Sequence, residues 1–384
     1  MKRWFLILTC GLLVAAADVG TPTLHWREAQ AQRLVDWLED ARQDGLEKLT
    51  REVPALQSAI ATHDPDTIDS VATDAALRLL EAHRVGCCGA SLREGWHIEQ
   101  NAVTPDPLAA LRLALEQNRV DSLFVAARPE HPFYLALRKA YGTEKDPVRR
   151  ATLAANLDRW RWMPREQGVR YLLVNTASFE ATLWDRGHQA GRWQVIVGKT
   201  RSPTPIFAAK VTGVIFNPWW EIPSSIVEES VGALLRNQPA EAARKGYVTD
   251  GTRYRQKPGP DNALGRMKLI MPNPYNIYLH DTPSQSLFGR DVRAFSHGCV
   301  RVGDALGLAT ALLAPLPDWD RDRVEAEVAT GKTAMIALAP PIPVYVAYFT
   351  AESDGQGGVR YLPDIYKRDR AATASGGDGA QCGR

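Results

Sequence analysis

The sequence predicts an α+β protein: an N-terminal helical part, then a mostly antiparallel β-sandwich interrupted by a short helical insert. From about residue 24 to residue 164, apolar residues recur at helical spacing. From Gly168 onward, short β-rich runs separated by Gly, Pro and Asn replace that pattern. One helical stretch at about residues 224–247 interrupts these runs. The 384 residues are enough for two domains of ordinary size.

The N-terminus has the layout of a secretory signal. Lys2 and Arg3 precede an apolar run at residues 4–14, and Ala15-Ala16-Ala17 fits a small-residue cleavage site. We therefore expect a signal peptide at residues 1–17; an uncleaved anchor is the alternative. The run is shorter than the ~20 residues that span a bilayer, and no other stretch of the sequence could span one. Cys10 lies inside the apolar run, which is a poor context for lipidation.

The helical part is expected to form a scaffold domain over residues 18–166. Residues 68–80 carry apolar residues at helical spacing. Asp106-Pro107 and Asp146-Pro147 each supply an N-cap followed by proline at the first helical position. Pro164 stops the last of these helices.

The β-rich part is assigned to a catalytic domain over residues 167–366. Arg186-Gly187 suggests a turn between two of its strands, and a helix is expected at 304–313. A hairpin of residues 342–350 and 359–366 is expected around residues 355–358, followed by a disordered tail at 367–384. The other predicted strands are residues 169–174, 179–184, 193–197, 211–216 and 277–279.

Within this part, the insert at about 224–247 opens on Ser225-x-x-Glu228, which matches a capping box. Its apolar face would be Val227, Val231 and Leu234.

The charge balance argues against a nucleic-acid partner. Lys and Arg total 46 against 44 Asp and Glu, and loss of Lys2 and Arg3 with the signal leaves 44 of each sign. Among the cysteines, Cys87 or Cys88 could form a disulfide with Cys382, or the pair could stay free. No zinc-type spacing surrounds the pair.

The most informative segment is His280, followed fifteen residues later by Ser296-His297-Gly298-Cys299-Val300-Arg301. A thiol becomes a good nucleophile when a base lies beside it, so Cys299 and His280 are candidates for covalent catalysis. The side chain of Asp281, or its backbone carbonyl, could fix the imidazole tautomer. The helix expected from Asp304 would favour the thiolate if its N-terminus faced the sulfur.

Gly298 removes a side chain where a substrate backbone would pass. The N–H groups of Gly298 and Cys299 are candidates for an oxyanion hole. Two simpler readings compete with catalysis. Cys299 could be a buried apolar residue. Alternatively, His280, His297 and Cys299 could bind zinc, although no fourth ligand is indicated.

The signature His280–x15–Ser296-His297-Gly298-Cys299 resembles that of the L,D-transpeptidases, whose catalytic domain is called YkuD. Further segments resemble the YcbB-like branch of that family. They are Leu157-Asp158-Arg159-Trp160-Arg161-Trp162-Met163-Pro164, the runs 197–205, 216–223 and 255–260, and above all 272–283 (PNPYNIYLHDTP). These motifs run in order from about residue 157 to 301.

The resemblance implies a YkuD-like fold and an enzyme of the periplasm that acts on peptidoglycan stem peptides and needs no cofactor or metal. Cys299 matches the family's nucleophile and His280 its general base, and His297 and Gly298 match the remaining signature positions. The thiolate would attack the third residue of a tetrapeptide donor and release D-alanine. The amine of a diamino acid in a neighbouring stem would then resolve the thioester into a 3→3 cross-link.

Four weaker assignments concern the peptide cleft. Tyr278 and the pair Trp219-Trp220 could line it, although packing on a β-face is equally expected of large aromatics. Arg301 could hold a substrate carboxylate, or be an exposed arginine. Ser296 is a further candidate for substrate contact, although bracing the loop is the more natural role for it.

Two departures from the family pattern stand out. Many YkuD signatures carry Asn where Arg301 stands, although the YcbB-like branch tolerates Arg. YcbB-like proteins often carry a separate peptidoglycan-binding module, and the run from Tyr141 to Pro147 leaves no room for one. Wall engagement would then depend on the scaffold, on the insert, which resembles a shortened capping subdomain, or on cell-wall synthesis partners.

Three other activities stay open. The same thiol could serve an L,D-carboxypeptidase, or an enzyme that attaches or releases wall-bound proteins. The third alternative is a non-catalytic wall-binding scaffold, which gives neither Cys299 nor His280 a function.

Overall fold

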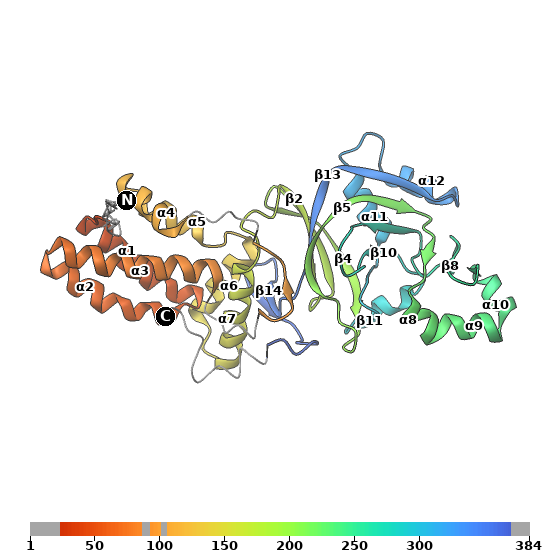
Figure 1. Cartoon of the computed structure of the whole chain (residues 1–384), viewed down its shortest axis with the longest axis horizontal. Helices are drawn as coiled ribbons and strands as arrows, with labels where there is room; N and C mark the ends of the chain where they lie inside the picture. The colour runs from red at the N-terminus through yellow and green to blue at the C-terminus, as the bar shows by residue number, and fades with distance from the viewer. Residues whose placement is uncertain (1–23, 87–92, 101–105, 370–384) are drawn as a thin grey trace, which may run out of the picture.

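The structure is a computed structural model that describes residues 24–86, 93–100 and 106–369 (Figure 1). The predictions on the signal peptide, on Cys10, Cys87, Cys88 and Cys382, and on the tail from residue 370 lie outside these residues. Within them, no helix is both long enough and apolar enough to cross a bilayer.

The N-terminal helices pack around one apolar core, which includes Leu34, Leu38, Leu56, Leu79 and Phe124. The predicted N-cap of α4 is confirmed, because the Asp106 carboxylate accepts a hydrogen bond from the Leu108 N–H with Pro107 at the first helical position. The elements are α1 (Glu28–Asp40), the 3₁₀ segments η1 (Ala41–Asp44) and η2 (Glu47–Arg51), α2 (Glu52–Thr62), α3 (Pro65–Val85), α4 (Pro107–Glu116) and α5 (Val120–Ala127).

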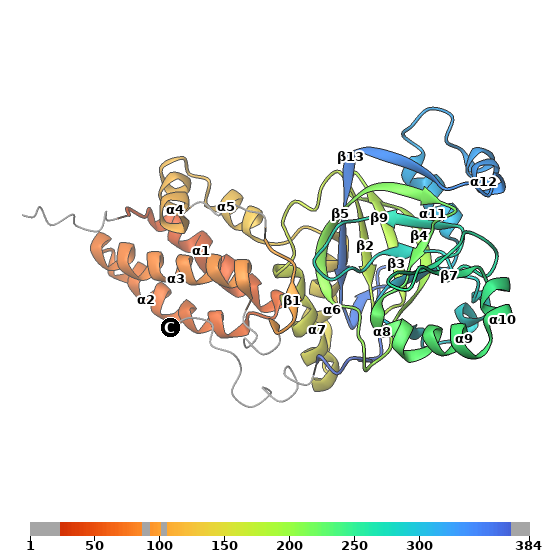
Figure 2. The same ribbon diagram turned by 45° about the vertical axis from the view of Figure 1, so that its right-hand side comes forward.

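The last two helices of this part, α6 (Pro132–Thr143) and α7 (Pro147–Arg161), belong to a second core that they share with the β-sheet. Asp146 caps α7 as predicted, through the Arg149 N–H. Trp160 stacks on Phe349, with ring centroids 4.6 Å apart. The helical part therefore has two cores, and the second joins it to the sheet (Figure 2). Only residues 144–146 separate α6 from α7, so no module is inserted there.

The sheet closes on itself. Its neighbours follow the order β5-β13-β2-β3-β4-β12-β10-β9, and β9 pairs back onto β5. Six of these eight contacts are antiparallel, whereas β13–β2 and β10–β12 are parallel. The mostly antiparallel sheet is thus confirmed, but its form is a barrel and not a sandwich of two open sheets. The strands are β2 (Arg170–Asn175), β3 (Glu180–Asp185), β4 (His188–Gly198), β5 (Ile206–Phe216), β9 (Met267–Ile270), β10 (Leu279–His280), β12 (Val300–Val302) and β13 (Ala334–Ala347).

Shorter elements complete the barrel. β1 (Trp96–His97) adds to β5 and β11 (Ala294–Ser296) adds to β4, both in parallel. The predicted helix after the signature is α11 (Ala305–Leu313), which packs against the barrel core with α12 (Arg321–Ala329).

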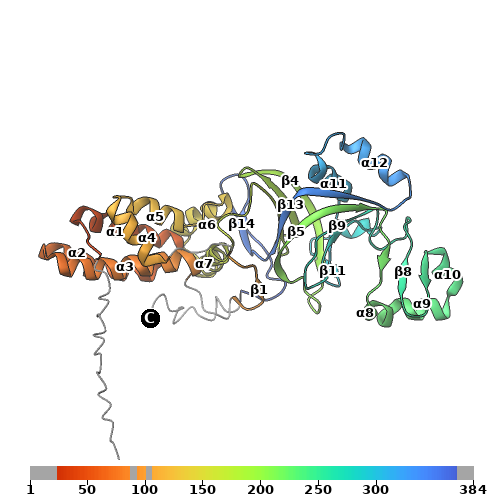
Figure 3. The ribbon, with the colours of Figure 1, turned by 45° about the horizontal axis from the view of Figure 1, so that its top comes forward.

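The insert lies at the end of the barrel away from α1–α5 (Figures 1 and 3). It has its own small core of Trp220, Ile222, Val231 and Leu264. The predicted capping box is wrong: the first helix starts at Ser224 after Pro223, and no side chain caps it. The elements are β6 (Trp220–Glu221), α8 (Ser224–Ile226), the π-helical turn η4 (Val227–Val231), α9 (Gly232–Asn237), α10 (Pro239–Arg244), β7 (Tyr247–Thr249) and β8 (Tyr254–Gln256).

The C-terminal hairpin is shorter than predicted. It pairs β14 (Ala351–Ser353) with β15 (Val359–Tyr361), and residues 342–347 are instead the end of β13. β13 ends at Ala347 because, beyond it, side chains bond the backbone in place of a neighbouring strand. The Asn175 amide bonds both backbone groups of Phe349, and the Asn156 side chain accepts from the Thr350 N–H.

Candidate active site

Two short parallel strands bring the signature residues together. In the register of β10 and β12, Leu279 lies opposite Val300 and His280 lies opposite Arg301. The Val300 N–H donates to the Tyr278 carbonyl at 3.0 Å, which extends the pairing to Tyr278 and Cys299. Alternate side chains share a face, so Tyr278, His280, Cys299 and Arg301 all project from one face, with the thiol diagonal to the imidazole.

His280 is held as a neutral base. Its Nδ1 lies 2.5 Å from the Asp281 carbonyl, and a carbonyl only accepts, so Nδ1 carries the hydrogen and Nε2 keeps its lone pair. Burial lowers the pKa of His280 to about 3; the charges of Arg301 and Lys268 add to the shift, and the carbonyls of Asp281 and Leu264 oppose it. The Asp281 carboxylate instead bonds the backbone N–H and Nε of Arg266, each at 2.9 Å. Of the two predicted orienting groups, the backbone carbonyl is therefore the one in place.

The Cys299 thiol lies in a partly covered position beside Tyr278. Burial raises the pKa of the thiol, while hydrogen bonds with Tyr278 and the charges of Lys268 and Arg301 lower it. At the N-terminus of α11, Asp304 caps the helix through the Gly307 N–H. With Cys299 shifted up and His280 shifted down, the proton stays on sulfur at neutral pH and the imidazole is free to accept it.

The signature loop is shaped by a glycine and two hydroxyls. Gly298 has φ +124°, a conformation that side chains disfavour. The Ser296 hydroxyl donates to the Cys299 carbonyl at 2.6 Å and accepts from the Gly298 N–H at 3.0 Å. Thr204, which the sequence analysis missed, donates to the Gly298 carbonyl at 2.7 Å.

These contacts change two predictions. Because Ser296 is buried and its hydroxyl is committed to the loop, it positions Cys299 and does not contact substrate. Because the Gly298 N–H is already bonded, it is no longer a candidate for the oxyanion hole, and the Cys299 N–H stays as the candidate.

His297 faces the insert. Its Nε2 lies 2.7 Å from the Glu229 carboxylate and 3.0 Å from the Lys199 ammonium. Lys199 and Arg201 also lie within 4 Å of Glu229. Hydrogen bonding by His297 lowers the pKa of Glu229, and the charges of His297, Lys199 and Arg201 add to this effect. This placement favours docking of the insert over a direct part in catalysis, for which His297 was a candidate through its position in the signature.

The predicted zinc alternative gains no support from this geometry. Among residues 24–86, 93–100 and 106–369, no group of three or more His, Cys, Asp or Glu side chains is arranged to hold a metal ion.

The aromatic candidates divide into two kinds. Tyr278 packs against the core of the insert, which includes Trp220, and burial raises its pKa, as does the charge of Cys299. Its ring lies 5.7 Å from that of His280. Trp220 is buried in the core of the insert, whereas Trp219 is exposed under the Arg255 guanidinium. Tyr278, on the same strand face as Cys299, and the exposed Trp219 thus stay candidates for peptide contact, whereas Trp220 packs inside the insert.

Lys268 is the second residue that the sequence analysis missed. It lies opposite His280 on β9, and its Nζ lies 3.7 Å from the centre of the Tyr278 ring. Arg301 lies opposite His280 on the other side, in β12. No signal in the sequence marked Lys268, because only the strand register brings it beside the signature.

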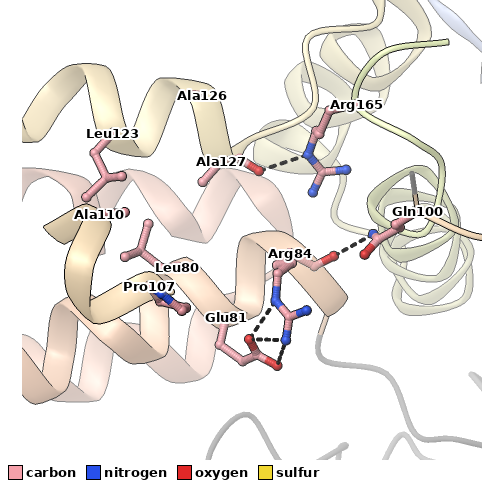
Figure 4. A pocket seen from close by; sticks show the side chains of 10 residues that line it. All are labelled: Leu80, Glu81, Arg84, Gln100, Pro107, Ala110, Leu123, Ala126, Ala127 and Arg165. Carbon is pink, nitrogen blue, oxygen red and sulfur yellow. Dashed lines mark hydrogen bonds and ion pairs between the residues drawn. The ribbon is translucent and has the colours of Figure 1, made fainter. Parts of the chain in front are cut away.

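An apolar cavity of about 240 Å³ lies in the helical part, between α3, α4 and α5 (Figure 4). The Glu81–Arg84 ion pair lines it, together with Arg165, which donates to the Ala127 and His83 carbonyls. Leu80, Ala110 and Leu123 supply apolar walls. Among the described residues that line this cavity, no nucleophile lies beside a base, so the candidate active site is the one around Cys299.

Comparison with known families agrees with this assignment. Residues 169–336 match the family model of the L,D-transpeptidase catalytic domain, YkuD, and residues 22–140 match a model described as a scaffold domain. The β-rich part of the chain is therefore similar to an L,D-transpeptidase catalytic domain.

One relative is a Haemophilus influenzae protein provisionally named an L,D-transpeptidase. It is 32% identical over 250 residues, which cover 59% of this chain and 50% of the relative. The chain thus spans about half the length of that relative. Among solved structures, an L,D-transpeptidase from Mycobacterium smegmatis is 13% identical over 47% of this chain and 58% of its own, with a TM-score of 0.26. Enterococcus faecium L,D-transpeptidase, as a C442S variant, is 15% identical over 48% of this chain and 52% of its own, with a TM-score of 0.24.

Proposed function

We propose that this protein is a cysteine-dependent L,D-transpeptidase that forms 3→3 cross-links between peptidoglycan stem peptides. One observation supports it most: Cys299 and His280 share a face of paired strands, and the bond of Nδ1 to the Asp281 carbonyl leaves the lone pair on Nε2. The match of residues 169–336 to the L,D-transpeptidase catalytic domain supports the same reaction class.

In the first half-reaction, His280 takes the proton of Cys299 as sulfur attacks the carbonyl of the third stem residue. The Cys299 N–H stabilises the oxyanion. As the tetrahedral intermediate collapses, His280 returns the proton to the nitrogen of the terminal D-alanine, which leaves, and a thioester forms.

In the second half-reaction, the amine of a diamino acid in another stem attacks the thioester. His280 takes a proton from the attacking nitrogen and returns it to sulfur, which leaves as the thiol. The products are a new amide bond and the starting enzyme, with no cofactor consumed.

Incubation with disaccharide-tetrapeptides tests this function. Mass spectrometry is expected to find cross-linked dimers, free D-alanine and an adduct on Cys299, all absent from a Cys299→Ser variant. D-alanine release without dimers would instead identify a carboxypeptidase. The absence of both D-alanine and adduct would reject the proposal.

We also propose that the chain belongs to the YcbB-like branch and works in the periplasm. The ordered motifs at residues 157–301 support the branch, and the layout of residues 1–17 supports export. The N-terminal sequence of the protein recovered from the periplasm is expected to begin near Asp18; an intact N-terminus in the cytoplasmic fraction would contradict this.

A further inference from the structure

Three neighbouring strands set one row of side chains across the barrel. His280 on β10 lies opposite Lys268 on β9 and opposite Arg301 on β12. Residues directly opposite each other in a sheet point to the same face. Lys268, His280 and Arg301 therefore form a row, with Tyr278 and Cys299 in the next row on that face.

Among the described residues, neither cation of this row is paired with a carboxylate. In the part of the chain that the structure describes, no ion pair joins Lys268 or Arg301 to an acidic side chain. The nearby acids are engaged elsewhere, since Asp281 bonds Arg266 and Glu229 bonds His297. Lys268 lies over the face of Tyr278, with its Nζ 3.7 Å from the ring centre.

Leaving these charges unpaired is costly. Both side chains are only partly exposed, and burial lowers the pKa of each while the charge of Cys299 opposes that shift. Partly desolvated cations in proteins are usually matched by anions or hydrogen bonds. Two such cations beside one sulfur indicate that the matching anion arrives with a ligand.

We propose that Lys268 and Arg301 form a carboxylate-binding subsite beside Cys299. Its ligand is a peptide with a free carboxylate close to the carbonyl that the sulfur attacks. The link to a peptide rests on the proposed function, whereas the anion subsite itself does not. Arg301 supplies planar paired donors and Lys268 a compact charge, so the two bind a carboxylate from opposite sides of His280.

A pair of alkylating reagents tests the subsite without any transpeptidation. Iodoacetate and iodoacetamide both transfer a two-carbon group to sulfur with loss of iodide, and only iodoacetate carries a carboxylate. The rate constants for Cys299 are measured on the full chain at one pH and ionic strength, by peptide mass mapping, because other cysteines are present. The iodoacetate-to-iodoacetamide rate ratio is expected to be about tenfold higher in the folded protein than in urea.

Variants identify the residues responsible. Lys268→Met and Arg301→Met should each lower this ratio about fivefold or more, whereas Lys268→Arg should keep it. The matched control is Lys139→Met, an exposed lysine on α6 that should leave the ratio unchanged. Urea unfolding confirms that each variant is folded, and the Lys268→Arg result stands if Lys268→Met fails to fold.

Two outcomes would overturn the subsite. One is an equal ratio in the folded and unfolded protein. The other is a Lys268→Met variant in which both reagents slow by the same factor, since that variant would have changed only the thiol. The proposed function is tested separately. If the iodoacetate-to-iodoacetamide ratio is raised in the folded protein but no D-alanine is released, the subsite is supported and the transpeptidase activity is rejected.

Discussion

At the scale of single residues, the chemistry depends on where one proton rests. Burial raises the pKa of Cys299 and lowers that of His280 to about 3, so the resting pair is a thiol and a neutral imidazole from about pH 4 up to the raised pKa of Cys299. The pair is thus set for proton transfer during attack, and not for a standing ion pair.

This assignment predicts that His280→Gln separates two reactions. Alkylation by iodoacetamide needs only the thiolate, so its rate should change by less than about threefold. Acylation by a tetrapeptide donor or a carbapenem needs a base during attack, so it should fall at least about 100-fold. In the unmodified protein, the alkylation rate should rise about tenfold per pH unit from pH 6 up to the raised pKa of Cys299. A flat rate between pH 5 and 7 would instead indicate a preformed thiolate–imidazolium pair.

Gly298→Ala is expected to destabilise the signature loop. The backbone at φ +124° disfavours any side chain, and the new Cβ would lie 3.0 Å from Cδ1 of Ile277. Urea unfolding should show a loss of about 1–3 kcal/mol, with slower alkylation of Cys299. Adding Ile277→Val removes the contacted methyl group. If backbone strain dominates, this second change should not rescue stability, and full rescue would assign the cost to the contact.

The spacing of the signature predicted Cys299, His280 and Gly298, because nucleophile, base and glycine are local requirements that residue types reveal. Lys268 and Thr204 could not be predicted in the same way. Lys268 is beside His280 only through the β9–β10 register, and Thr204 reaches Gly298 only through the fold of a separate loop. Both relations depend on tertiary structure.

At the scale of elements, local sequence rules predicted where helices begin better than where the last long strand ends. Asp106-Pro107 and Asp146-Pro147 open α4 and α7 as expected, because cap and proline act within one turn. The end of β13 was predicted three residues too late. There, the side chains of Asn175 and Asn156 bond the backbone in place of a neighbouring strand. Both residues lie more than 170 positions away in the sequence, so no local pattern predicts the end of the strand.

The insert is an element whose docking can be tested. Through Glu229, the insert contacts His297, Lys199 and Arg201. The side chains of these four residues are all at least partly exposed. Because exposed ion pairs are individually weak, Glu229→Gln should loosen the insert without unfolding it and increase amide hydrogen exchange across residues 224–244 about threefold to tenfold. The unmodified protein should show the same increase at 1 M salt.

The control for this experiment is the adjacent residue. Glu228→Gln removes a charge of the same kind, at an exposed position that forms no ion pair in the described structure. Its exchange should match that of the unmodified protein. If both variants exchange equally fast, net charge and not the Glu229 contact controls the insert.

At the scale of the whole molecule, the two cores of the helical part meet across polar contacts. Asp44 accepts from the Tyr134 hydroxyl at 2.6 Å and from Nε of Arg138 at 3.0 Å, and Arg165 donates to the His83 carbonyl. In contrast, α7 meets the sheet through packed aromatic rings, including Trp160 on Phe349. Removing the chain that precedes α6 should therefore lower the free energy of unfolding far less than removing everything through α7.

Two truncations test this difference. A chain starting at residue 129 keeps α6, α7 and the His131 cap, although it loses β1 and Trp96 from the second core. Because the stack of Trp160 on Phe349 remains, it should fold with lower stability than the full chain and react at Cys299 at the same rate. A chain starting at residue 167 loses Trp160 and Trp162 and exposes the rings they cover. At about 1.5–3 kcal/mol per large apolar side chain, this loss approaches the whole stability of a domain. It should elute as aggregate in size-exclusion chromatography and show no cooperative urea transition, whereas equal stability of the two chains would show that α6 and α7 are dispensable to the barrel.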